Sequence, residues 1–287
     1  MIPSYSTGTS FFKATSLLQQ PAEKLFEELT PLASCIVSEC LPYATQIVKK
    51  INVLRVSFVG VIYFCLLCMH NITTHTVRES ITSESECFVL PGIPDKIEIT
   101  IAQAGQPMNE SWKRLMKNLG KLKCLDHLDK AQRGKASIGV SQHLEWLDCQ
   151  KSGTVIYACL GSLCNLTTPY GWNSTLEAIC AGVPMLTRPL FADQFLNEIL
   201  VVHVLKVGVE IPLTWDKKVE IGVQLKKEDA ERAIVKLMYE TSESEERRKR
   251  VKELAEMAKR AVEKAGSSHS NMTLLIEEIM QKTKRDV

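Results

Sequence analysis

One run of residues, from Gly171 to Glu198, constrains the fold more than any other part of the chain. Its sequence is GWNSTLEAICAGVPMLTRPLFADQFLNE. The polar residues 173–175 suit a helix N-terminus, and the apolar residues after them recur at helical spacing until Gly182 and Pro184 end the pattern. Residues 183–186 are typical of a short buried strand. The run therefore predicts a helix, a strand and a polar loop in close succession.

The same run predicts where a ligand could bind. A helix that begins after a glycine turn offers unpaired backbone N–H groups and a partial positive charge, which suit a phosphate. Glu177, one turn into the helix, can accept hydrogen bonds from neighbouring hydroxyls such as those of a ribose. Asp193 and Gln194 follow on the loop and place two polar side chains together for hydroxyl recognition.

These residues resemble the second half of the signature segment of the plant family 1 UDP-sugar-dependent glycosyltransferases. The family form reads His-Cys-Gly-Trp-Asn-Ser, then Glu three residues later, then Pro-x-x-x-Asp-Gln. The resemblance extends less evenly over most of the chain, and the flanks are most similar to the branch that glucosylates hormones, flavonoids and triterpenoids. We call Gly171 to Glu198 the signature segment below.

The resemblance implies a role for each matching residue, with Gly171 opening the donor site. Asn173 and Ser174 would contact the phosphates, Glu177 the ribose hydroxyls, Trp172 the sugar, and Asp193 and Gln194 the hydroxyls of the sugar. Taken singly, each residue has a simpler interpretation: Asn173 and Ser174 as helix caps, Trp172 as core, Glu177 as a first-turn charge and Asp193 as a turn former. Their occurrence in one ordered run favours the functional interpretation.

The chain also departs from the family pattern close to this segment. Pro169 and Tyr170 occupy the places of His-Cys, and proline can donate no hydrogen bond where the family's His contacts the diphosphate. The family's uracil-stacking Trp has no counterpart, because the sequence passes directly from a predicted strand at 154–160 to the signature segment. Arg188 replaces the usual Trp before Pro189.

A Gly-Ser pair ends that predicted strand. Gly161 and Ser162 are expected to form a turn that lets the backbone approach a phosphate. The alternative is an ordinary turn at the end of a strand, which the same two residues would also suit. In the family this turn faces the diphosphate and the acceptor, so the order of the turn and the signature segment favours a donor site.

The first part of the chain alternates between strand and helix patterns. Residues 34–38 and 54–59 read as buried strands on either side of a helix at 41–51, which predicts a parallel α/β sheet. Glu39 lies where the first strand ends, the edge at which such sheets place functional groups. By resemblance, this place holds an Asp that orients a catalytic His, and the chain is expected to begin after the segment that carries that His. Glu39 is thus either a catalytic-site residue or a solvated loop carboxylate.

The remaining patterns are simpler. We expect helices at 11–30, 199–205, 228–239, 245–264 and 272–280, with Pro21 as a break or a new start in the first of them. We also expect a strand at 207–211 and a charged loop at 212–224. Residues 76–110 are rich in turn-forming residues and resemble the family's acceptor-pocket loops. The run EERRKRVK has mixed signs at helical spacing and favours a solvated helix face over a nucleic-acid patch.

Composition excludes several classes of function. A net charge of +2 gives no electrostatic reason for a nucleic-acid partner. The ten cysteines are scattered along the sequence, and no cluster of metal-ligand residues is found in it. Cys65 and Cys68 lie in an apolar run, which favours buried thiols over a metal or redox site. The uncharged stretch Val56 to Met69 holds fourteen residues, whereas a membrane span needs about 20. The first residues lack an apolar signal region, which favours a cytoplasmic protein.

Together these observations predict an α/β protein of the GT-B type, with two incomplete Rossmann-like lobes that hold parallel sheets. The expected acceptor-binding lobe spans residues 1–125, a linker spans 126–150, and the UDP-sugar-binding lobe spans 151–287. The expected function is inverting transfer of a sugar, glucose above all, from a UDP-sugar to a hydroxyl of a plant small molecule, by a monomer without cofactor or metal. The alternative is a catalytically inactive relative that at most binds a ligand or a partner.

Overall fold

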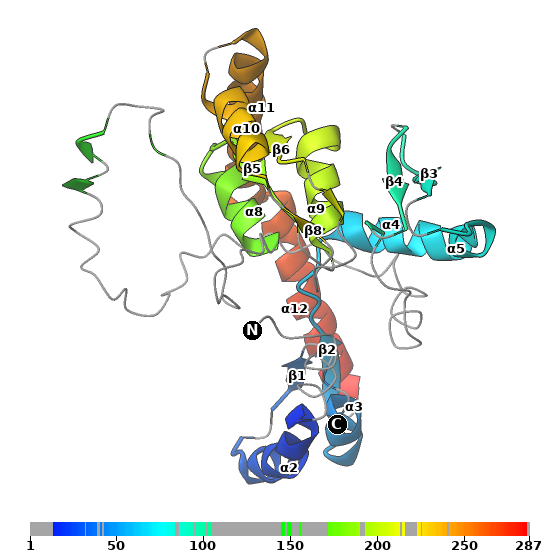
Figure 1. Cartoon of the computed structure of the whole chain (residues 1–287). Coiled ribbons are helices and arrows are strands. Elements are labelled where there is room, and N and C mark those ends of the chain that lie inside the picture. Colours follow the sequence, from blue (N-terminus) through cyan, green and yellow to red (C-terminus); the bar gives the residue numbers. More distant parts are fainter. Residues whose placement is uncertain are drawn as a thin grey trace. The chain divides into compact units, whose positions relative to one another are not determined.

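The structure is a computed structural model (Figure 1). It describes residues 14–31, 33–38, 41, 43–83, 86–94, 96–101, 103–104, 145–146, 148–150, 155, 172–189, 193–212, 214–215, 223–224, 226–239 and 241–285. By their contacts these residues form two compact units. Unit 1 is drawn from Met1–Val61 and Lys264–Val287, and unit 2 from Ile62–Leu122 and Asp126–Glu263. The predicted lobe boundaries stay a prediction.

Unit 1 is built on a two-stranded parallel sheet. Its elements are η1 (Ser16–Leu18), α2 (Gln19–Glu28), β1 (Cys35–Ser38), α3 (Ala44–Lys50), β2 (Leu54–Ser57) and α12 (Ser267–Arg285). The strands pair in register from Cys35 opposite Leu54 to Ser38 opposite Ser57. The strand–helix–strand order and the parallel direction agree with the sequence prediction. Pro21 lies in the first turn of α2, where its missing N–H costs no helical hydrogen bond.

The core of unit 1 is small. Ile36 of β1 packs with Tyr43, Ile47 and Val48 at α3, and Phe26 of α2 lies against this cluster. Lys50 of α3 reaches back to α2, where its ammonium lies 3.0 Å from Glu23 and 2.8 Å from Glu27. Apolar side chains nevertheless remain open to solvent, and Val37 of β1 is 61% exposed. A strand with one uncovered face agrees with the prediction of an incomplete lobe.

Unit 2 holds the signature segment. Its elements are α4 (Tyr63–Thr74), α5 (Val77–Ser80), β3 (Cys87–Val89), β4 (Glu98–Thr100), α8 (Trp172–Cys180), β5 (Met185–Thr187), α9 (Gln194–Ile199), the π-helical turn η3 (Leu200–Val204), β6 (Gly208–Glu210), β7 (Thr214–Trp215), β8 (Val223–Gln224), α10 (Lys227–Met238) and α11 (Ser242–Val262).

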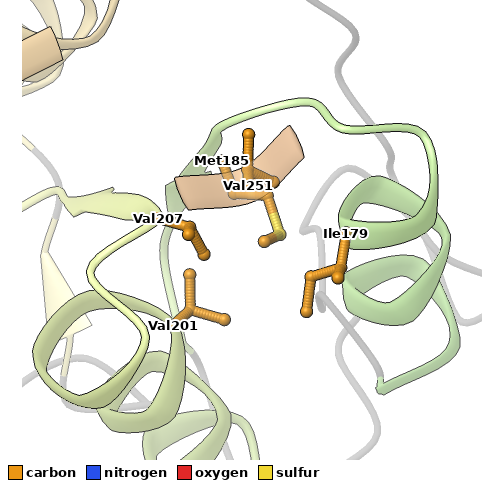
Figure 2. Packing of buried hydrophobic residues seen from close by; sticks show 5 residues of the cluster. All are labelled: Ile179, Met185, Val201, Val207 and Val251. Atoms are coloured by element: carbon orange, nitrogen blue, oxygen red, sulfur yellow. The ribbon is translucent and has the colours of Figure 1, made fainter. Parts of the chain in front are cut away.

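A parallel pair, β5 and β6, forms the centre of unit 2, in register from Met185 opposite Gly208 to Thr187 opposite Glu210. Successive side chains of a strand point to opposite faces, so β5 serves two clusters. One face packs Met185 with Ile179 of α8, Val201 of η3, Val207 and Val251 of α11, and Figure 2 shows these five side chains pointing toward one another. The other face packs Leu186 against a cluster of Val209, Ile211, Ala233 and Leu237. Helices therefore cover both faces, as in a Rossmann-like lobe.

The structure adds two strand pairs that the sequence did not predict. Cys87–Val89 and Glu98–Thr100 pair antiparallel within the region predicted as turn-rich. Thr214–Trp215 and Val223–Gln224 also pair antiparallel, within the predicted charged loop. Strands of two or three residues are too short to show a period in the sequence, which explains both differences. The last helix also begins at residue 267 and not at 272, because Ser and Asn at its start hid the helical pattern.

The mixed-sign helix face is confirmed on α11. Arg250 pairs with Glu246 at 2.7 Å and Arg247 with Glu243 at 2.7 Å, each one turn apart on the helix. Arg247 departs from the prediction, since its side chain is buried and its guanidinium also reaches the backbone carbonyl of Lys236 at 3.5 Å. In the part of the chain that is described, no helix has both the length and the apolar character that crossing a membrane requires.

Candidate functional site

The first turn of α8 carries most of the predicted phosphate and ribose contacts. The helix begins at Trp172, so Asn173 and Ser174 lie inside the first turn and not before it as caps. Asn173 and Glu177 are exposed and one turn apart, which places them on one outer face of α8. Thr175 faces inward and is 3% exposed. Trp172 is half-buried.

The end of α8 is set by Gly182, as predicted. Its φ of 67° lies in the left-handed region that glycine enters without strain. The N–H of Gly182 donates to the Ile179 carbonyl at 2.9 Å, and the N–H of Val183 donates to the Ala178 carbonyl at 3.0 Å. These two bonds form a Schellman motif, which turns the chain from α8 into β5.

Asp193 and Gln194 lie where the sequence predicted two adjacent polar residues, at the start of α9. The Asp193 carboxylate accepts a hydrogen bond from the side-chain amide of Asn197 at 2.9 Å, one helical turn later. Gln194 is 5% exposed. Asp193 therefore makes a local hydrogen bond at the start of α9.

Asn197 is a site residue that sequence reasoning missed. It is 3% exposed, and its side-chain oxygen accepts a hydrogen bond from the Cys65 thiol at 3.1 Å. The Asp-Gln-x-x-Asn spacing, with Asp and Asn four residues apart on one helix face, was the available signal. Cys65 and Cys68 are fully buried, as predicted, and burial raises the pKa of the Cys68 thiol to about 12. Burial raises the pKa of Cys65 as well, so both thiols stay protonated.

A small hollow lies between α8, β5 and α9. Its volume is about 10 Å³, which is roughly the space for one water molecule. Most of the surface that faces the hollow is apolar, although residues with polar side chains contribute to its lining: Thr175, Thr187, Arg188, Gln194, Asn197 and Glu198. The structure thus brings Gln194, predicted for the sugar, together with Thr175, the neighbour of the predicted phosphate residue Ser174. We call this space the α8–α9 hollow.

Glu198 lines the hollow and has a perturbed pKa. Thr187 donates a hydrogen bond to its carboxylate at 2.7 Å. Burial raises the pKa of Glu198 to about 7, and the carboxylate of Glu210 adds to the increase while the Thr187 hydrogen bond opposes it. Glu210 in turn lies 3.6 Å from the His203 ring. A buried carboxyl of this kind exchanges its proton close to neutral pH.

Arg188 also lines the hollow. Among the residues that the structure describes, its Nε is the one buried side-chain nitrogen or oxygen without a hydrogen-bond partner. Burial lowers the pKa of the guanidinium. The sequence singled out Arg188 only as a departure from the family's Trp.

A second and wider groove, about 580 Å³, lies over η3, β6, α10 and α11. Of the predicted site residues that the structure describes, none lines this groove. Its charges are largely neutralised within the groove by ion pairs, among them Arg232 with Asp229, Lys236 with Glu243 and Arg250 with Glu246. The described residues contain no group of three His, Cys, Asp or Glu side chains that could hold a metal ion.

Four predicted site residues lie outside the described residues: Glu39, Gly161, Ser162 and Gly171. The arrangement of all predicted donor residues around one cleft stays a prediction. What the structure describes is a parallel pair with helices on both faces, followed at the end of β5 by a small hollow. This arrangement is part of a Rossmann-type lobe.

Comparison with known proteins agrees with that architecture. The family model for UDP-glucoronosyl and UDP-glucosyl transferases matches residues 165–217. UDP-glycosyltransferase 73C11 of Barbarea vulgaris is 34% identical over an alignment that covers 94% of this chain and 79% of the relative. UDP-glycosyltransferase 73C3 of Arabidopsis thaliana is 34% identical, with 94% and 78% covered. The chain belongs to the plant family 1 UDP-glycosyltransferases and is shorter than these relatives.

Solved structures confirm the GT-B fold. One of them is UGT73P12 of Glycyrrhiza uralensis, complexed with glycyrrhetinic acid 3-O-monoglucuronide, which superposes on this chain with a TM-score of 0.77 at 24% identity. The superposition covers 97% of this chain and 79% of the UGT73P12 chain. A UDP-glucose: anthocyanidin 3-O-glucosyltransferase in complex with UDP gives a TM-score of 0.67 at 16% identity, with 94% and 82% covered. The prediction of an α/β, GT-B-type member of this family is confirmed, and the family's reaction is glycosyl transfer from a UDP-sugar.

Proposed function

We propose that this chain uses UDP-glucose as its donor and transfers glucose, with inversion, to a hydroxyl of a plant small molecule of the hormone, flavonoid or terpenoid class. The observation that carries the proposal is the composition of the α8–α9 hollow. Thr175 from the first turn of α8 and Gln194 from the start of α9 line the same small space. A sugar diphosphate needs phosphate contacts and hydroxyl contacts within a few ångströms of each other, and these two segments would supply them.

The proposed roles follow the signature segment. Gly161, Ser162 and Gly171 would bring backbone N–H groups to the diphosphate, with Asn173 and Ser174 as side-chain contacts. Glu177 would accept hydrogen bonds from the ribose, Trp172 would contact the sugar, and Asp193 and Gln194 would bind its hydroxyls. Asn197 would hold the Asp193 carboxylate in place through their 2.9 Å hydrogen bond.

We propose further that turnover is slow. A positioned general base contributes about 10²- to 10⁴-fold to such a reaction, and Glu39 stands where the resemblance expects the Asp that orients this base. Pro169 removes a donor where charge gathers on the leaving group, and the loss of one such donor costs about 3 kcal/mol. The absence of a Trp matched to the uracil platform should weaken donor binding separately. Binding of UDP-glucose without efficient transfer is therefore the expected behaviour.

The test combines donor binding with product formation. Purified chain is titrated with UDP-glucose by calorimetry and incubated with UDP-glucose and a panel of phenolic acceptors, with glucoside formation followed by mass spectrometry. The variant Glu177→Gln should weaken UDP-glucose binding about tenfold, since one charged hydrogen-bond acceptor is lost. Glu231→Gln, an exposed residue of α10, is the matched control and should leave binding unchanged.

Three results decide between the alternatives. Weak binding with near-background transfer supports the proposal, and no binding of UDP-glucose at all would leave only the inactive relative. Turnover of about 1 s⁻¹ or more, as ordinary enzymes show, would mean that another residue acts as base. The first residues to mutate would then be His70, half-buried in α4, and His75, exposed at its end.

We also propose that the reaction needs no metal or cofactor and that the chain works as a monomer in the cytoplasm without a nucleic-acid partner. A net charge of +2 and the ion-paired charges of α11 support the last point. Light scattering after gel filtration measures the oligomeric state. UDP-glucose binding that survives a chelator supports metal independence, whereas binding that returns only with added Mg²⁺ or Mn²⁺ would contradict it.

A further inference from the structure

Arg188 is placed where an anion could bind. It is the first residue after β5, and the carboxyl ends of parallel strands are the edge at which α/β sheets bind ligands. Its Nε is buried and lacks a hydrogen-bond partner, the one such side-chain atom in the described ranges. A buried donor without an acceptor costs about 1–3 kcal/mol, and more when the group is charged. Such a donor needs an explanation, and an acceptor from outside the protein chain, such as a water molecule or an ion, is one.

The surroundings of Arg188 indicate what kind of acceptor fits. The α8–α9 hollow admits one oxygen atom and not a whole phosphate group, since its volume is about 10 Å³. Thr175 and Gln194 line it beside Arg188. An acceptor there would therefore be a single oxygen of a larger ligand that spans the segments proposed to hold phosphate and sugar.

The charges around the hollow allow an anionic oxygen. Glu198 is the acidic residue in the lining, and no ion pair within 4 Å joins it to Arg188 among the described contacts. Because its pKa is raised to about 7, Glu198 is protonated in a large share of molecules near neutral pH. Guanidinium groups bind phosphate oxygens through short charge-assisted hydrogen bonds, and this preference makes a phosphate oxygen the fitting acceptor.

We propose that Arg188 binds an oxygen of the donor's diphosphate and supplies, from the end of β5, a cationic contact next to the first turn of α8. The inference rests on the proposed function, because it takes the diphosphate from a UDP-sugar. Arg188 is a binding residue in this proposal and takes no part in proton transfer. The competing occupant of the hollow is a water molecule that accepts from Nε.

The experiment measures the affinity for inorganic pyrophosphate, UDP and UDP-glucose by calorimetry. The variant Arg188→Met keeps the length of the side chain and removes the charge, and it should weaken pyrophosphate and UDP about 10- to 100-fold. Arg188→Lys should recover part of the loss. Arg260→Met is the matched control, because Arg260 is exposed on α11 and its Nε donates to the Glu256 carbonyl of the same helix. It should bind all three ligands as the unchanged chain does.

A second measurement covers the case in which Arg188→Met does not fold. Arginine labelled with ¹⁵N at Nε gives a resonance for Arg188, identified by its loss in Arg188→Lys, and pyrophosphate should shift this resonance. Unchanged ligand affinity in a folded Arg188→Met, or a resonance that pyrophosphate does not move, would show that water alone fills the hollow and would overturn the inference.

The outcomes separate the inference from the proposed function. If the chain binds UDP-glucose and Arg188→Met binds it equally well, the inference is wrong and the function stands. If pyrophosphate binds through Arg188 but UDP and UDP-glucose bind no more tightly than pyrophosphate, the anion site stands and the UDP-sugar function does not. If none of the three ligands binds, both are wrong.

Discussion

The variant Glu198→Gln should stabilise the protein, and increasingly so as the pH rises. Glu198 lies in a site that disfavours its charge: burial raises the pKa from an ordinary 4.5 to about 7, with Glu210 acting in the same direction. The Thr187 hydroxyl donates to the carboxylate at 2.7 Å and only partly offsets this cost. Glutamine has nearly the same shape, carries no charge and keeps an oxygen that can accept from Thr187.

The magnitude follows from linkage between proton binding and folding. Below pH 4.5 the carboxyl is protonated in both the folded and the unfolded chain, so Glu198 costs nothing there. Between pH 4.5 and 7 the folded chain holds a proton that the unfolded chain has released, and the free energy of unfolding falls as the pH rises. Above pH 7 the full cost is present, about 3 kcal/mol at about 1.4 kcal/mol for each pKa unit.

The assay is urea unfolding followed by circular dichroism at pH 5 and pH 8. Glu198→Gln should raise the free energy of unfolding by about 3 kcal/mol at pH 8 and by about 1 kcal/mol or less at pH 5. Glu231→Gln is the matched control, because Glu231 is 60% exposed and its loss should change stability by less than about 0.5 kcal/mol at either pH.

Two results would refute this reasoning. A gain of the same size at both pH values would mean that the charge of Glu198 is not what costs stability. A loss at pH 8 would mean that the ionised carboxylate is well paired and that its pKa in the folded chain lies below 4.5. A carbon-13 titration of the Glu198 carboxyl, with an expected midpoint near pH 7, provides a direct check.

The other predictions concern the packing around β5 and are measured by urea unfolding. Gly182→Ala should cost about 1–2 kcal/mol because alanine is strained at a φ of 67°, and Gly182→Asn should cost less; equal losses would contradict this cause. Gly208→Ala should cost more, since its new Cβ would lie 2.5 Å from Val201 Cγ1, and Val201→Ala should relieve part of that cost in the double variant. Val251→Ala should cost about 2–3 kcal/mol, because Val251 is 0% exposed, whereas Val235→Ala, at 52% exposure, should change little; similar values for the two would show that the cluster in Figure 2 is not a core.

The sequence predicted those structural features that depend on residues close together in the chain. The end of α8 at Gly182 and the parallel direction of β1 and β2 follow from glycine chemistry and from strand–helix alternation, both of which act over a few residues. The family of the chain followed from one ordered run of residues, the signature segment. These predictions did not depend on contacts between segments that are distant in the sequence.

Contacts between distant segments left no such pattern. Nothing near Cys65 indicates that its thiol reaches Asn197, since the two are 132 residues apart. The perturbed carboxyl of Glu198 arises from burial against β5 and from Glu210 on the neighbouring strand, and neither effect can be read from the residues beside Glu198. Arg188 could be recognised as a departure from a family pattern, but its unpaired Nε is a property of the packed structure alone.

The position of Asn197 limits how this protein can be redesigned. One primary amide donates to Asp193 through its nitrogen and accepts from Cys65 through its oxygen. Aspartate at this position would lose the bond to Asp193, and leucine would lose both bonds. An engineer who transplants the loop after β5 from a relative therefore has to move three positions as a set. Two of them lie on the transplanted loop and its helix, and the third lies on α4, in a part of the chain that a segment swap would leave behind.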